Sequence, residues 1–87
     1  FDLSFEVALD AAAGDLAQST GAVSPLVERA SIFDDYRDPS SDLRAVAVRY
    51  RLRATDRTLE TEEIAAIRKQ MIDSAAALGA VLRGADG

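Results

Sequence analysis

The sequence predicts a single α+β domain in which two helices cover one face of a four-stranded antiparallel sheet. Strict alternation of apolar and polar side chains indicates strands, and apolar side chains that recur at three and four residues indicate helices. The third observation is the order of the elements, in which each helix lies between two strands. The 87 residues suffice for one small domain, residues 1–87, which we expect to be a fragment of a longer chain. The predicted strands cover residues 1–9, 27–36, 43–54 and 80–83, and the predicted helices cover residues 12–23 and 61–78.

The first strand and the first helix are defined by their apolar spacing. Every odd position of the strand is apolar, so these side chains share one face: Phe1, Leu3, Phe5, Val7 and Leu9. Helical spacing places a second set on the buried face of the helix: Ala13, Leu16, Thr20 and Val23. Pro25 fits the end of this helix, because a proline disfavours helix in the residue before it.

The second strand changes its alternation partway along. Ala30 and Ile32 suit the buried face, and then the adjacent Phe33 does. We therefore expect a β-bulge near Ile32 and Phe33. Such a bulge turns Asp34 and Tyr36 toward the open face of the sheet. The polar residues 38–42 then form a turn.

The third strand has one apolar and one cationic face. Its apolar positions are Val46, Val48, Tyr50 and Leu52, and its cationic positions are Arg49, Arg51 and Arg53. Because the apolar set requires a core, the guanidinium groups must meet water or an anionic partner, and the sheet is open on one side. Two interpretations remain. Arginine is common on solvated strand faces, and arginine also binds phosphates and stacks on bases.

The second helix and the last strand complete the fold. Thr61 is the expected N-cap, with Glu62 and Glu63 facing the positive end of the helix dipole. Gly79 is placed to end the helix, and the short strand after it is an edge strand. The order βαββαβ gives a ferredoxin-like sandwich. The helix side chains expected to lie on the sheet are Ile64, Ile67, Met71, Ala75 and Leu78.

Composition excludes several classes of site. The chain has no cysteine and no histidine, so it holds no disulfide, no thiolate metal site and no histidine-dependent nucleophile. The acids Asp34, Asp35 and Asp38 lie at one strand end and do not converge on a metal ion. We therefore expect no catalytic residue, metal or cofactor in this domain. The sequence shows neither a membrane-spanning segment nor a secretory leader, which favours a cytoplasmic protein without a membrane partner.

The charge of the whole chain opposes binding to RNA. Fifteen acidic and ten basic residues give a net charge of -5, whereas counterion release from phosphates requires cations. The charges are segregated, however, because five arginines lie between Arg44 and Arg57 with one acid, Asp56, among them. A local cationic patch is therefore compatible with RNA binding.

Several segments carry a resemblance to a known family. They read IFDDYR at residues 32–37, LRAVAVRYRLRA at 43–54, DRTL at 56–59 with EEI at 62–64, and LGAVLRG at 78–84. Together with Asp2 and Leu3, these segments resemble the ferredoxin-fold anticodon-binding domain that ends the beta subunit of bacterial phenylalanyl-tRNA synthetase. The resemblance spans nearly the full chain. In the turn after Tyr36 the family's glycine and lysine are missing, Asp35 replaces an apolar residue, and Phe1 replaces an arginine.

The resemblance implies a module that holds the anticodon end of phenylalanine tRNA while the chemistry occurs elsewhere in the enzyme. Tyr36 matches the tyrosine that stacks on an anticodon base, and Asp34 would accept hydrogen bonds from a base edge. Strand parity adds Arg49 and Arg51 as phosphate or base contacts. The remaining candidates are Ser4 and Arg53, which share this face, and Arg44, which stands where a basic residue is expected.

The implied partners are the anticodon stem-loop, the other domains of the beta subunit and the alpha subunit. The parent enzyme would use ATP and magnesium. A different class of function remains open at this point. The same fold serves regulatory and protein-interaction modules that bind a small ligand or a partner chain, and topology alone does not separate them.

Overall fold

The computed structural model of the chain describes residues 1–37, 39–40, 42–54 and 56–86. It confirms the predicted order of elements and the ferredoxin-like α+β fold. The second and fourth strands end later in the chain than the sequence predicts, whereas the first and third strands and both helices are slightly shorter. The elements are β1 (Asp2–Ala8), α1 (Ala13–Gly21), β2 (Val27–Arg37), β3 (Leu43–Leu52), α2 (Thr61–Ala77) and β4 (Val81–Asp86).

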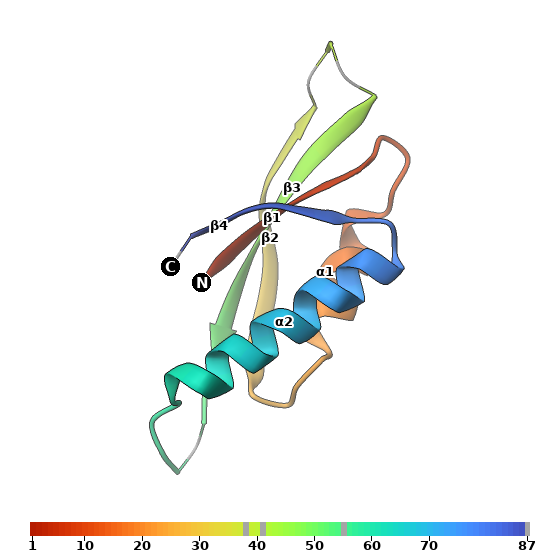
Figure 1. Cartoon of the computed structure of the whole chain (residues 1–87). Coiled ribbons are helices and arrows are strands. Elements are labelled where there is room, and N and C mark those ends of the chain that lie inside the picture. Colours follow the sequence, from red (N-terminus) through yellow and green to blue (C-terminus); the bar gives the residue numbers. More distant parts are fainter. Residues whose placement is uncertain (38, 41, 55, 87) are drawn as a thin grey trace.

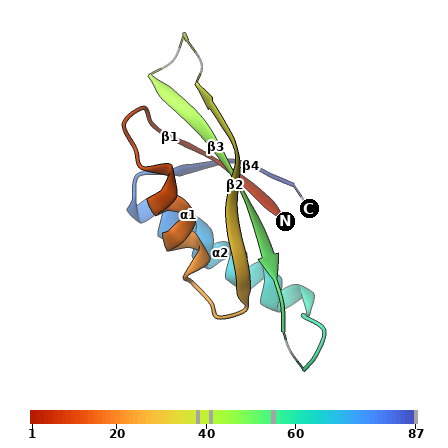
Figure 2. The same ribbon diagram turned by 180° about the vertical axis from the view of Figure 1, so that it is seen from behind.

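The four strands form one antiparallel sheet in the order β2-β3-β1-β4, so β2 and β4 are its edges. Both helices lie on the same side of the sheet, where α1 contacts β2 and α2 contacts β4 (Figures 1 and 2). No helix in the described part of the chain covers the other side, which we call the open face. The predicted open sheet is therefore present.

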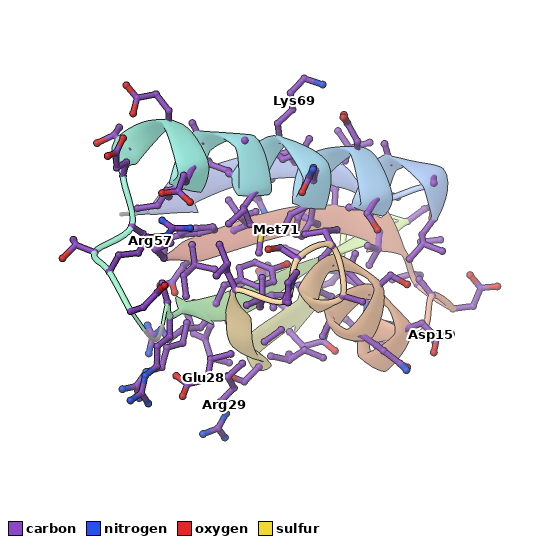
Figure 3. All side chains as sticks on the ribbon, turned by 90° about the horizontal axis from the view of Figure 1, so that it is seen from below. Asp15, Glu28, Arg29, Arg57, Lys69 and Met71 are labelled. Carbon is purple, nitrogen blue, oxygen red and sulfur yellow. The ribbon has the colours of Figure 1, made fainter. Side chains whose placement is uncertain are left out.

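The core lies between the helices and the sheet. Alternate side chains of β1 and β3 are buried there, as the alternation predicted, and Met71 points toward them from α2 (Figure 3). The hydroxyl of Tyr50 donates a 2.7 Å hydrogen bond to Oγ1 of Thr20, which satisfies the polar end of a buried ring. The hydrophobic core residues with the least exposure are Leu3, Phe5, Val46, Val48, Tyr50, Met71, Ala75 and Ala80.

Three local predictions need correction. Leu9 and Leu78 are exposed, because Leu9 follows the end of β1 and Leu78 is the C-cap of α2 rather than part of its buried stripe. The N-cap of α2 is Glu60, not Thr61. Its side chain accepts a hydrogen bond from the backbone of Glu63, whose own side chain accepts one from the backbone of Glu60.

Two glycines allow close geometry at the helix ends. Gly79 has a φ of 80°, a left-handed conformation that ends α2 as predicted. Gly21 ends α1 directly against β2, where a Cβ atom would lie 2.9 Å from the Cβ of Ala30. The absence of a side chain at Gly21 therefore lets the helix approach the sheet closely.

Candidate nucleic-acid interface

A β-bulge places the predicted recognition residues on the open face. The pairing of β2 with β3 shifts between Ile32 and Asp34, which confirms the bulge expected from the sequence. After the shift, Asp34 pairs with Ala47 and Tyr36 pairs with Ala45. Directly opposed residues of an antiparallel pair share a face. Both recognition candidates thus lie on the side away from the helices, and the Tyr36 side chain is 55% exposed.

The sequence assigns Ile32 and Phe33 to the core, but both side chains are exposed in the structure. Ile32 lies on the helix side of the edge strand and is 38% exposed. The Phe33 side chain is 49% exposed, and the guanidinium carbon of Arg49 lies 4.5 Å from the centre of its ring. Phe33 is the extra residue of the bulge, so it has no direct partner in β3 and turns toward the open face. The structure therefore brings a second aromatic ring to the candidate interface.

Small and polar side chains lie next to Tyr36 on the open face. Ala45 and Ala47 are its neighbours on β3, and Glu6 and Ser4 oppose them on β1. This part of the face, which we call the aromatic end, consists of Tyr36, Asp34, Ala45, Ala47 and Ser4. A flat ring can rest on such short side chains, and the Asp34 carboxylate and the Ser4 hydroxyl border them as polar groups.

Three arginines, Arg49, Arg51 and Arg53, occupy another part of the open face, and each of these three has an acidic partner. Arg49 binds Asp2 in a bidentate manner, with 2.9 Å from Nε to Oδ1 and 3.1 Å from Nη2 to Oδ2. These hydrogen bonds hold the pKa of Asp2 below its ordinary value. Arg51 and Arg53 share the single carboxylate of Glu28, at 3.0 Å and 3.3 Å. We call this part the arginine end.

Comparison with known proteins agrees with this geometry. The family model for the ferredoxin-fold anticodon binding domain matches residues 1–83 of the 87. The chain belongs to this family. No curated protein matched the chain in the comparison.

Arg44 is the one candidate of this anticodon-binding domain that lies away from the open face. It has the same parity as Val46, its side chain is 7% exposed, and it faces the helix side of the sheet. Its Nη1 donates a 2.7 Å hydrogen bond to the carbonyl oxygen of Leu9. Its Nε lies 3.3 Å from the Asp35 carboxylate. Arg44 thus connects the end of β1 to the β2–β3 hairpin, where burial separates it from any ligand on the open face.

The anticodon-binding domain also has an apolar pocket on its helix side. The pocket has a volume of about 210 Å³ and lies between the start of α1 and the end of α2, beside Leu16, Leu78 and Ala80. Small-molecule sites are typically about 300–1,000 Å³ and contain several convergent polar groups. Here the lining contains a single ionisable side chain, Asp15. The pocket therefore offers little support for the regulatory alternative.

The described residues contain no group of three metal-ligating side chains and no helix that could cross a membrane. Asp38, one of the three acids considered for a metal ion, lies outside the described residues. Phe33, Arg29 and Glu28 are not among the site residues that the sequence predicts, although they lie at this candidate interface. Arg29 could have been found because it lies next to Ala30, which the sequence assigns to the buried face. Glu28 could not, because a second register shift lies between Val27 and Arg29.

Proposed function

We propose that this domain is the anticodon-binding module of a phenylalanine-tRNA ligase beta subunit. Its open face binds the anticodon loop of phenylalanine tRNA, and aminoacylation takes place in another part of the enzyme, which supplies the ATP and magnesium sites. The cytoplasm, where translation occurs, is the expected location. The alpha subunit and the other beta-subunit domains are the expected protein partners.

One observation carries this proposal. The bulge at Phe33 turns Tyr36 and Asp34 out of the core and onto a sheet face that no described helix covers. An exposed aromatic ring on a strand is a stacking surface for an unpaired base, and the carboxylate two residues away accepts hydrogen bonds from the base edge. Neither the Tyr36 ring nor the Asp34 carboxylate packs in the core, so core packing does not explain their positions.

The arginine end completes the proposed interface. Arg49, Arg51 and Arg53 are 61%, 73% and 65% exposed, so an RNA backbone reaches their guanidinium groups without any change in the fold. Their carboxylate partners fix the orientation of the guanidinium groups before binding. Phosphate oxygens can then bind the N–H groups that still face water.

Replacement of Tyr36 by alanine tests the proposal. Loss of one base-stacking contact costs about 1 to 3 kcal/mol, so the dissociation constant for the anticodon stem-loop of phenylalanine tRNA is expected to rise about 5- to 150-fold. Tyr36→Phe keeps the ring and retains most of the affinity. Fluorescence anisotropy of a labelled stem-loop, titrated with the full-length protein, measures both constants.

Leu78→Ala is the matched control, because it removes a 51% exposed apolar side chain on the helix side of the fold. It should leave the dissociation constant unchanged. In the assembled ligase, Tyr36→Ala should reduce tRNA charging and leave amino-acid activation with ATP nearly unaffected. If the Tyr36→Ala protein binds the stem-loop with wild-type affinity, the proposal is rejected. If the wild-type protein binds free amino acids instead of the stem-loop, the regulatory alternative is favoured.

A further inference from the structure

A shallow groove crosses the arginine end of the open face. It is lined by Arg29, Ser31, Arg49 and Arg51 and has a volume of about 190 Å³. The register explains why these side chains meet, since Arg29 pairs with Arg51 and Ser31 pairs with Arg49. Two strands therefore contribute donors to one small concave surface, and all of its lining side chains carry N–H or O–H groups.

The direct pairing of Arg29 with Arg51 is unfavourable in the free protein. Like charges directly opposite each other on one sheet face destabilise a strand pair. Arg51 is partly neutralised, but it shares the Glu28 carboxylate with Arg53. Among the residues that the structure describes, Arg29 has no ion-pair or hydrogen-bond partner, although it lies beside Glu28 in the chain (Figure 3).

The groove is therefore a local cationic site in an acidic protein. Three arginines around one glutamate leave a net charge of +2 at this end of β2 and β3, whereas the whole chain has a net charge of -5. An anion between Arg29 and Arg51 would receive hydrogen bonds from both guanidinium groups and remove their mutual repulsion. A phosphodiester has the charge and the acceptor oxygens that this arrangement requires.

We propose that the groove binds a backbone phosphate of the same RNA strand whose base stacks on Tyr36, with Arg29 and Arg51 as its ligands. This inference rests on the proposed function and adds Arg29 to the interface. The hydroxyl of Ser31, which pairs with Arg49 one step further along the groove, is a further donor to the phosphate.

The distance along β2 indicates that this phosphate belongs to a different nucleotide from the one stacked on Tyr36. Arg29 and Tyr36 are seven positions apart with one bulge residue between them, which corresponds to roughly 20 Å of strand. A nucleotide stacked on Tyr36 cannot place its own phosphate that far away. The groove therefore holds the phosphate of a nucleotide further along the loop, and the face spans several nucleotides, as single-strand binding surfaces do.

Replacement of Arg29 by glutamine tests the inference with the same stem-loop. Loss of one phosphate contact to a single strand lowers the slope of log K against log salt by about 0.7. Between about 50 and 200 mM salt, the fold-change in the dissociation constant should then be smaller than in wild type by a factor of about 2.6. Lys69→Gln is the charge-matched control, since Lys69 points away from the sheet on α2 and pairs with Asp73 (Figure 3).

The stability of the free protein provides a second readout. Arg29→Gln removes the repulsion opposite Arg51 and should raise the melting temperature, whereas a purely structural role of Arg29 would lower it. A higher melting temperature together with a smaller salt slope supports the inference. If Arg29→Gln leaves the salt slope unchanged while Tyr36→Ala still loses affinity, the groove does not bind a phosphate and the proposed function stands. If Tyr36→Ala also binds normally, both proposals fail.

Discussion

Replacement of Gly21 by alanine tests how closely α1 must approach β2. The new methyl group would lie 2.9 Å from the Cβ of Ala30, well inside ordinary carbon–carbon contact. Both atoms are fixed to the backbone, so neither can rotate away as the end of a long side chain could. The end of the helix would have to shift away from the strand.

Two opposing effects set the size of the change. Alanine is favoured over glycine by about 1 kcal/mol in a helix interior, and by less at Gly21, which is the last residue of α1. Overpacking a close contact costs about 1–3 kcal/mol. The clash therefore outweighs the propensity, and we expect a loss of about 1–2 kcal/mol of stability. For a domain of this size that corresponds to a fall in melting temperature of about 4–16 °C.

Gly14 supplies the matched control within the same helix. Nothing lies within 4 Å of a Cβ built at this position, so Gly14→Ala should be neutral or stabilising. Thermal unfolding followed by circular dichroism compares the two variants. In the Gly21→Ala background, Ala30→Gly should cost less than it does in wild type, because it removes the clashing methyl group. A Gly21→Ala protein as stable as Gly14→Ala would refute the reasoning.

Two further predictions concern buried and surface polar groups. Tyr50→Phe removes the hydrogen bond to Thr20 and should lower the free energy of unfolding by about 0.5–1.5 kcal/mol in urea denaturation, with an unchanged m-value. The Thr20 hydroxyl keeps its own hydrogen bond to the carbonyl oxygen of Leu16. A loss of stability well above this range would therefore contradict the assignment. Arg49 depresses the pKa of Asp2, so the stability from this pair is present above the unfolded-state pKa and is lost as the pH falls through the folded-state pKa. An NMR titration should show the Asp2 midpoint rising in Arg49→Gln, and equal midpoints would exclude the interaction as the cause.

Local patterns in the sequence predicted most of the fold because the core depends on alternation. The parity of Val46, Val48 and Tyr50 was sufficient to orient β3, and two consecutive apolar residues in β2 revealed the bulge. The face on which Phe33 lies was not predictable in the same way. A bulge adds a residue without a direct partner, so parity no longer fixes where that side chain points.

The candidate site was less predictable, because its charges are arranged by strand register. Asp2 lies in β1 and Glu28 in a register shift of β2, and neither can be matched to an arginine until the pairing of the strands is known. Arg44 is a different case. Its position two residues before Val46 places it on the apolar face, so parity alone predicts its burial and contradicts the binding role that the family resemblance implies.

The irregular pairing of β2 has a consequence for self-association. An eleven-residue strand at the border of a sheet offers unpaired amide and carbonyl groups to which a second polypeptide can add, and such addition is the first step of aggregation. Two bulges interrupt the regular spacing of these groups, and the same strand carries both acidic and basic side chains. The β2 edge is in this way made a poor template for the addition of a second copy of the protein.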